Sequence, residues 1–319
     1  MSSASAAAKL ILCGEHAVVY GRPAIALPLS DLRAQATVSA GAPGAGPQIV
    51  APDLGGSWLA RERPDHPLSE LALAVLERLG RPHADVTITL ASAIPIASGM
   101  GSGAAIATAM VRALAAHADA HFSSADVAEL VYSSERRFHG TPSGIDNTVV
   151  AYERAIWFVR GDQGQTGGAS SPTIEPIAIG APLTLLVGDT GVRSATKLPV
   201  GAVREGWQAD QARYEALFDR IGALAQEVRA ALAAGDAPAL GRLLDANQAA
   251  LEQLGVSSPE LGRLVAAARE AGALGAKLSG AGWGGVMLAL VTPETRDAVA
   301  EALREAGAAR VLSATVAAD

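Results

Sequence analysis

The sequence contains few cysteine, aromatic and lysine residues. Its single cysteine, Cys13, excludes an intrachain disulfide framework and fits a reducing compartment. Aromatic residues make up 4% of a chain that is 50% hydrophobic, so Ala, Val, Leu and Ile must form most of the core. Of 25 basic residues, 22 are arginines and only Lys9, Lys197 and Lys277 are lysines. If surface positions in this chain default to arginine, the retained lysines are candidate functional residues.

Long apolar runs and clusters of positive charge are also missing. The segment 1–8 has no basic residue, and Glu15 soon interrupts the apolar run after Lys9, so we expect neither a signal peptide nor a membrane span. The net charge is −7 and no block is rich in Lys and Arg, which argues against nucleic acid as the main partner. We therefore expect a soluble cytoplasmic protein without a membrane or nucleic-acid partner. The sequence leaves association into a homodimer open.

The pattern of apolar residues predicts a mixture of strands and helices in two domains, 1–165 and 175–319, joined by the Gly/Ser/Gln-rich segment 161–172. Strands are expected at 9–13, 24–29, 33–39, 48–51, 85–90, 155–160, 183–188, 286–291 and 310–314. Helices are expected at 65–79, 104–117, 124–138, 200–218, 219–234, 236–254, 259–271 and 293–306.

The segment 94–107 (IPIASGMGSGAAIA) joins a predicted strand to a predicted helix through glycines at every second position. Glycine lets the backbone approach an anion and adopt positive φ, and the unpaired N–H groups at a helix start attract negative charge. This segment is therefore a candidate phosphate loop. It lacks the Gly-Lys-Ser/Thr end of a Walker A loop, and its G-x-G-x-G spacing differs from the dinucleotide fingerprint. A glycine-rich turn that only caps a helix is the simpler alternative.

Candidate functional residues that can carry charge occur at three other places in the sequence. Glu15 and His16 lie in a bend between two apolar strands, where burying charge is costly unless it is paired or faces a cleft. Glu135 lies at the edge of the buried face of its helix, and Asp146 is in a loop that Gly and Pro residues make rigid. Each could instead be an ordinary solvated or capping residue. A second glycine-rich loop occupies 277–285.

Taken together, these blocks resemble the mevalonate kinase branch of the GHMP kinase superfamily over nearly the whole chain. The block 9–21 (KLILCGEHAVVYG) is similar to the first motif of that branch. The block 95–105 is similar to the Pro…Gly-Leu-Gly-Ser-Ser-Ala phosphate loop, and 277–285 to the Gly-Ala-Gly-Gly-Gly motif. The block 135–147 is similar to the one that carries the magnesium Glu and the catalytic Asp.

The resemblance implies an α+β fold with two domains and the active site between them. The N-terminal domain would be α/β and similar to ribosomal protein S5, and the C-terminal one ferredoxin-like with added helices. The implied reaction transfers the ATP γ-phosphoryl group to the 5-hydroxyl of mevalonate, with Mg²⁺ as cofactor, on the mevalonate route to isoprenoids.

The resemblance also implies roles for single residues. Asp146 would deprotonate the hydroxyl, with Lys9 near it and the γ-phosphate, while Ser102 and Glu135 would hold Mg²⁺. The implied ATP-binding residues are Pro95, Ser98, Gly99, Met100, Gly101, Ser102, Gly103 and Ala104. The implied substrate-binding residues are Glu15, His16, Ser194, Thr196, Gly280 and Ala281, with Arg193 or Lys197 as a cation for the substrate carboxylate.

Three positions depart from the family motifs: Met100 replaces Leu, Gly103 replaces the second Ser, and Trp283 replaces a Gly. Two alternatives remain at this point. One is a GHMP kinase for another small alcohol or for phosphomevalonate. The other is a catalytically silent nucleotide sensor, which we would expect to have lost Lys9, Glu135 or Asp146, yet all three are present.

Overall fold

The computed structural model describes residues 1–96, 98–139, 143–161, 171–193 and 197–318. The chain forms two compact units that are discontinuous in sequence. The first unit contains Met1–Ala8, Leu32–Ile96 and Gly101–Glu153, and the second contains Lys9–Asp31, Ala97–Met100 and Arg154–Asp319. Most of the expected linker, 162–170, lies outside the described residues, so the domain boundary there stays a prediction.

The first unit contains a mixed sheet. Strands β1 (Ser2–Cys13) and β2 (Ala24–Ala40) pair with each other and contribute residues to both units. Within the first unit, β2 pairs antiparallel with β5 (Val86–Ser92), and β5 pairs parallel with β3 (Gln48–Ala51). Strand β4 (Gly56–Leu59) pairs antiparallel with β3 and ends this part of the sheet.

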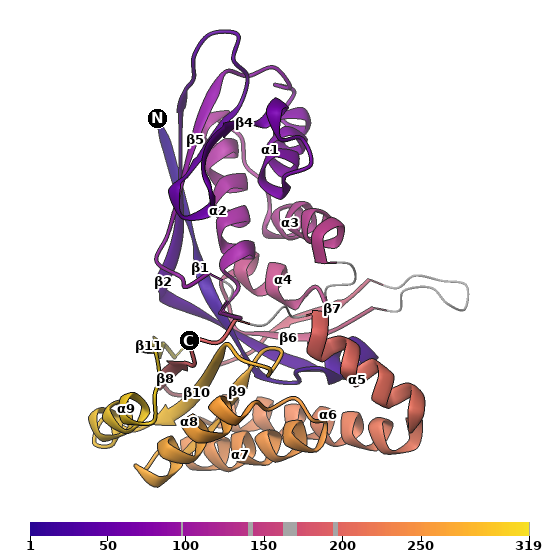
Figure 1. Cartoon of the computed structure of the whole chain (residues 1–319), viewed down its shortest axis with the longest axis vertical. Helices are drawn as coiled ribbons and strands as arrows, with labels where there is room; N and C mark the ends of the chain where they lie inside the picture. The colour runs from indigo at the N-terminus through magenta and orange to yellow at the C-terminus, as the bar shows by residue number, and fades with distance from the viewer. Residues whose placement is uncertain (97, 140–142, 162–170, 194–196, 319) are drawn as a thin grey trace. The chain divides into compact units, whose positions relative to one another are not determined.

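Helix α2 (Ser102–His117) is the centre of the first unit, because it packs against β5 and the three other helices (Figure 1). Those helices are α1 (Pro67–Arg78), α3 (Ser124–His139) and α4 (Ile145–Tyr152). Twelve residues of α2 are buried, and many are alanines. Alanine is the best helix former and its small side chain lets neighbours approach closely, so the Ala-rich sequence suits a helix that is surrounded. Short 3-10 helices occur at Ala17–Tyr20, Pro52–Leu54 and Ala60–Glu62.

The second unit contains an antiparallel four-stranded sheet in the order β11-β8-β10-β9. Its strands are β8 (Leu183–Asp189), β9 (Gly275–Ser279), β10 (Val286–Val291) and β11 (Arg310–Val316). With helices between β8 and β9 and between β10 and β11, this is the β-α-β-β-α-β order of a ferredoxin-like domain. The expected ferredoxin-like architecture with added helices is therefore confirmed.

The helices of the second unit are α5 (Lys197–Ala209), α6 (Gln211–Ala234), α7 (Ala237–Gln253), α8 (Pro259–Glu270) and α9 (Arg296–Glu305). Helices α7 and α8 pack on β9, and α8 also packs on β10 and α9 (Figure 1). A further strand, β6 (Ile156–Val159), pairs with β2 and with β7 (Thr173–Pro176). No helix in the described part of the chain is long and apolar enough to cross a bilayer.

Several expected elements differ from the structure. The two strands expected at 24–29 and 33–39 are one strand, β2, because Ser30–Leu32 continue it. The helix break expected at 218/219 lies at Asp210, whose carboxylate caps α6 by accepting from the Arg213 N–H at 3.2 Å. Helix α4 was expected to be a loop. Strands β4 and β7 and the first half of β1 were not expected at all.

Candidate active site

The first glycine loop has the geometry of an anion-binding turn. Gly99 and Gly101 adopt left-handed φ values of 85° and 73°, which glycine takes without steric cost. Gly101 is the N-cap of α2, so the unpaired N–H groups of the first helical turn follow it directly. Ser102 begins this turn; its side chain is buried and its hydroxyl oxygen has no hydrogen-bond partner among the residues that the structure describes. Backbone donors, a helix dipole and an unsatisfied hydroxyl suit a phosphate or a phosphate-bound cation.

The preceding residues of the loop belong to the second unit and are tied to strand β1. The Lys9 N–H donates to the Met100 carbonyl at 3.0 Å, and Ser98 Oγ lies 3.4 Å from the Met100 N–H. Lys9, Ser98 and Met100 are all buried. Pro95 and Ala104 flank the loop, at the end of the β5 segment and inside α2. The structure therefore places Lys9 beside residues 98–100, which were predicted to bind ATP, within the second unit.

Glu135 and Asp146 lie on two helices of the first unit that pack together, α3 and α4. Glu135 is partly buried whereas Arg136 is exposed, as the helical pattern predicted. Asp146 is in the first turn of α4 and not in a loop. The sequence predicts a loop here because Gly and Pro residues precede Asp146, and the β-branched Thr148, Val149 and Val150 lower the helix propensity of the residues that follow. The side chains of 137–139 and the whole of 140–142 lie outside the described part of this motif.

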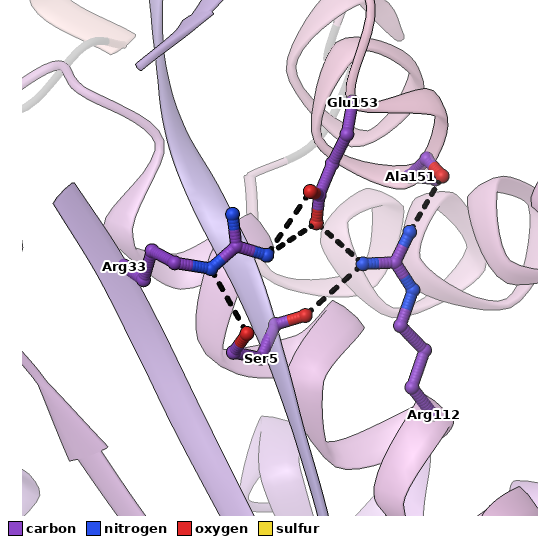
Figure 2. A network of polar contacts seen from close by, with 5 residues as sticks. All are labelled: Ser5, Arg33, Arg112, Ala151 and Glu153. Carbon is purple, nitrogen blue, oxygen red and sulfur yellow. Dashed lines mark hydrogen bonds and ion pairs between the residues drawn. The ribbon is translucent and has the colours of Figure 1, made fainter. Parts of the chain in front are cut away.

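Helix α4 is anchored at both ends, which fixes the position of Asp146. At its start, the buried Asn147 donates from Nδ2 to the Ala128 carbonyl of α3 at 2.9 Å. At its end, Glu153 adopts a left-handed φ of 48° and accepts hydrogen bonds from Arg33 and Arg112 (Figure 2). The same arginines reach Ser5, and Arg112 also donates to the Ala151 carbonyl at 2.8 Å (Figure 2). No local sequence pattern indicates this network, because Ser5, Arg33 and Arg112 are far from Glu153 in the chain.

The second unit contains a buried ion pair between Glu15 and Lys277. Glu15 is 1% exposed and Lys277 is fully buried, and the Lys277 Nζ also donates to the Leu278 carbonyl at 2.5 Å. Burial raises the pKa of Glu15 above its ordinary value, and the nearby Lys277 and Lys9 ammonium groups act in the opposite direction. Of the two expected arrangements for charge in this bend, a paired charge or one that faces a cleft, Glu15 adopts the paired one.

His16 lies beside this ion pair in the left-handed region, with a φ of 61°. Its Nε2 lies 3.1 Å from the Ala281 carbonyl, which can only accept, so Nε2 carries the hydrogen and Nδ1 remains an acceptor. Burial lowers the pKa of His16 from 6.5 to about 4, and the charge on Lys277 adds to this effect. The imidazole is therefore neutral at neutral pH. The structure brings together Glu15, His16 and Ala281, three of the predicted substrate-binding residues.

The stability of the protein is expected to fall as the pH drops from 6.5 to about 4. In this range an unfolded His16 binds a proton that the folded state excludes, so the free energy of unfolding decreases with decreasing pH. The full effect of the pKa difference is about 3 kcal/mol. Urea unfolding at pH 7.5 and 4.5 measures it against His16→Asn, since asparagine tolerates left-handed φ. An equal pH dependence in the wild type and the variant would contradict this prediction.

The second glycine-rich loop, residues 277–285, begins in strand β9 and leads into β10. Ser279 Oγ bonds both the N–H and the carbonyl of Ile11 at 3.0 Å, which ties this motif to β1. Gly282 needs to be glycine, because its φ is 91° and a Cβ there would lie 1.6 Å from the Val256 carbonyl oxygen. The Trp283 indole donates to the Gly255 carbonyl at 3.1 Å, so this departure from the family pattern packs on the turn after α7.

The predicted cations for a substrate carboxylate differ in their surroundings. Arg193 makes a two-pronged ion pair with the buried Asp189, at 2.7 and 2.8 Å. Burial acts to raise the pKa of Asp189, but the Arg193 guanidinium and the Gly191 N–H outweigh it and hold that pKa below its ordinary value. Lys197 is exposed at the start of α5. Ser194 and Thr196 lie outside the described residues, so their predicted role is not addressed by this geometry.

Comparison with known proteins identifies the family of the chain. The model of the GHMP kinases N terminal domain matches residues 68–154, and that of the GHMP kinases C terminal matches residues 228–309. The chain belongs to the GHMP kinases. The two matches lie on either side of the expected linker.

Relatives of this GHMP kinase are similar over nearly its full length. The mevalonate kinase of Thermococcus onnurineus is 35% identical over 324 residues, which cover 95% of this chain and 93% of that protein. The mevalonate kinase of Aeropyrum pernix is 35% identical over 303 residues, covering 90% and 87%. The crystal structure of L. major mevalonate kinase in complex with R-mevalonate is 30% identical, with a TM-score of 0.84 and coverage of 100% and 97%. The expected two-domain GHMP kinase fold is confirmed.

Two glycines of the first glycine loop of this GHMP kinase are expected to respond oppositely to substitution by serine. Gly103→Ser should raise the free energy of unfolding by roughly 0.5 kcal/mol, because serine is the better helix former and nothing lies within 4 Å of a Cβ there. Gly101→Ser should lower it by about 1–2 kcal/mol, because a side chain at φ 73° is strained. Urea unfolding and the KM for ATP measure both variants. Equal effects of the two substitutions would contradict this prediction.

Proposed function

We propose that this chain transfers the γ-phosphoryl group of ATP to the 5-hydroxyl of mevalonate and releases 5-phosphomevalonate and ADP. The observation that carries the proposal is the full-length identity of 33–35% to GHMP kinases named mevalonate kinase. Lys9, Ser102, Glu135 and Asp146 are present at the matching motif positions, whereas Gly103 replaces the second Ser of the phosphate-loop motif. We also propose the cytoplasm as its location.

Phosphoryl transfer depends on positioning and on charge neutralisation more than on covalent chemistry. The backbone N–H groups of residues 99–103 would hold the β- and γ-phosphates at the start of α2. The buried Lys9, whose backbone is bonded to Met100, would place a positive charge at the transferring group. Asp146 would orient the substrate hydroxyl and accept its proton, and the anchors of α4 at Asn147 and Glu153 would keep that carboxylate in place.

Ser102 and Glu135 fit the expected Mg²⁺. The cation prefers oxygen ligands and is usually held by one or two carboxylates together with substrate phosphates. The buried Ser102 hydroxyl, which has no partner within the described ranges, and the partly buried Glu135 carboxylate supply such oxygens in the first unit. When bound, Mg²⁺ neutralises charge on the β- and γ-phosphates.

Glu135→Gln is expected to raise the Mg²⁺ concentration needed for half-maximal activity by at least about tenfold. Substituting a residue that only supports a metal ligand commonly lowers metal affinity about tenfold or more, so substituting a ligand itself should cost at least as much. Titration of Mg²⁺ at saturating ATP measures it. Glu129→Gln is the matched control, since Glu129 lies on the same helix with a side chain that is 72% exposed. Similar Mg²⁺ dependence in both variants would rule out Glu135 as a ligand.

The proposed function is tested by an ADP-release assay with Mg-ATP that offers mevalonate, phosphomevalonate, homoserine and galactose separately. Turnover with mevalonate alone is the expected result. Turnover with one of the other compounds would retain the kinase chemistry and replace the substrate. A lack of turnover with all four, combined with measurable ATP binding, would favour the nucleotide sensor.

A further inference from the structure

Lys277 is a fully buried cation that the reaction described above does not use. It lies in the middle of β9, a strand whose five residues are all buried. Burying an ammonium group carries a large desolvation cost, and replacing a buried ion pair by apolar residues is often neutral or stabilising. Stability alone is therefore a weak reason for a lysine at this position.

Strand β9 holds Lys277 in a fixed place. It is the last strand of its sheet. One side of it pairs with β10, and side chains of α7 bond to the backbone on its other side. Asp245 accepts from the Ala276 N–H at 2.9 Å, and Gln248 Oε1 accepts from the Leu278 N–H at 2.8 Å. The backbone on both sides of Lys277 is thus satisfied, and the ammonium is directed to Glu15 and to the Leu278 carbonyl.

The charge on Lys277 acts on two predicted substrate-binding residues at once. It favours the ionised form of Glu15 against the effect of burial, and it disfavours the cationic form of His16. The other charged group near Glu15 is Lys9, which acts in the same direction. Burial raises the pKa of the neighbouring Cys13 thiol well above its ordinary range, so the thiol stays neutral and does not compete with Glu15 for the Lys277 ammonium.

The result is a pair of hydrogen-bond acceptors. Glu15 Oε1 is occupied by Lys277, whereas Oε2 is buried and has no hydrogen-bond partner in the described part of the chain. His16 donates from Nε2 to Ala281 and keeps Nδ1 as an acceptor. Acceptor atoms on these two buried side chains suit a hydroxyl group of a substrate and disfavour a carboxylate.

We infer that Lys277 is a positioning residue for the substrate side of the site, because its ion pair with Glu15 fixes Oε1 of that carboxylate and leaves Oε2 to accept from a substrate. The inference rests on the proposed function. Lys277 does not touch the reacting groups in this role. It acts through Glu15 and His16, and its loss is expected to change their protonation.

The pH profile of kcat/KM for mevalonate tests the inference with the full-length enzyme and Lys277→Met. Without the ammonium, the pKa values of Glu15 and His16 both rise, so the acid limb of the profile should move to higher pH by about one unit. Activity should fall about tenfold below that limb and recover above it. Lys277→Arg keeps the charge and should keep the wild-type profile. A Lys277→Met profile that is lowered by one factor at every pH, or unchanged, would overturn the inference.

Arg269→Met is the matched control. Arg269 pairs with Asp245 and donates to the Ala276 carbonyl, so its loss disturbs the same strand one residue from Lys277 without touching Glu15 or His16. The acid limb of the pH profile of Arg269→Met should stay at the wild-type pH. A shift equal to that of Lys277→Met would mean that any disturbance of β9 has this effect, and the inference would fail.

A second measurement does not depend on the folding of a variant. Nitrogen NMR of ¹⁵N-histidine-labelled wild-type protein, with His16→Asn for assignment, should show His16 neutral and protonated on Nε2 at pH 7. A cationic ring or the Nδ1-protonated tautomer would refute the inference. The kinetic assay of the wild-type enzyme separates the two proposals. If this enzyme did not turn over mevalonate, the proposed function would be refuted, but the histidine spectrum could still be interpreted.

Discussion

Asp146→Ala is expected to lower kcat for mevalonate phosphorylation by ~10²–10⁴, the range usual for removing a general base. KM for both substrates should change much less, because the carboxylate acts mainly on the proton that moves in the transition state. Asn147 and Glu153 anchor α4 independently of Asp146, so the substitution should leave the helix in place. Steady-state kinetics and circular dichroism of the same preparations measure both effects.

Asp126→Ala is the control for Asp146→Ala. Asp126 also lies in the first turn of a helix of the first unit, where it accepts from Ser123 and pairs with Arg78. This substitution should leave kcat unchanged while it weakens the start of α3. A loss of kcat below ~10² for Asp146→Ala would mean that the proton leaves by another route.

Glu15→Ala is expected to lower the free energy of unfolding by about 3–5 kcal/mol. The variant leaves the fully buried Lys277 ammonium without its carboxylate partner, and an unpaired buried charge costs far more than the pair itself contributes. A typical domain is stable by only about 5–15 kcal/mol, so the effect on the second unit is large. Urea unfolding monitored by tryptophan fluorescence would measure it, since three of the four tryptophans, Trp157, Trp207 and Trp283, belong to the second unit.

The double variant Glu15→Ala/Lys277→Met separates the ion pair from the rest of the fold. Removing both charges together should restore much of the lost stability, which gives a large coupling energy in a double-mutant cycle. Asp297→Ala is the control, because its ion pair with Arg296 is exposed to solvent, and it should barely change the unfolding midpoint. Additive effects of the two single substitutions at Glu15 and Lys277 would show that they do not depend on each other.

Elements with a strong local pattern were predicted correctly from the sequence. The helices α1, α2, α3, α7, α8 and α9 were identified within a few residues, because each has apolar residues at helical spacing or a run of good helix formers. The elements that were missed have weak local preferences. The first half of β1 is Ser/Ala-rich and is a strand only because β2 pairs with it. Helix α4 contains β-branched residues and depends on packing against α2 and α3.

The features of the candidate site likewise divide into those that the sequence predicts and those that only the structure reveals. The sequence by itself determined the family, the glycine loops and the candidates Lys9, Ser102, Glu135 and Asp146, because local motifs carry these features. It also marked Lys277 as one of three lysines in a chain rich in arginine. Only the tertiary structure decided that Lys277 pairs with Glu15, a residue 262 positions away in the chain. Such a pair has no local pattern, since burial and the fold alone bring the two charges together.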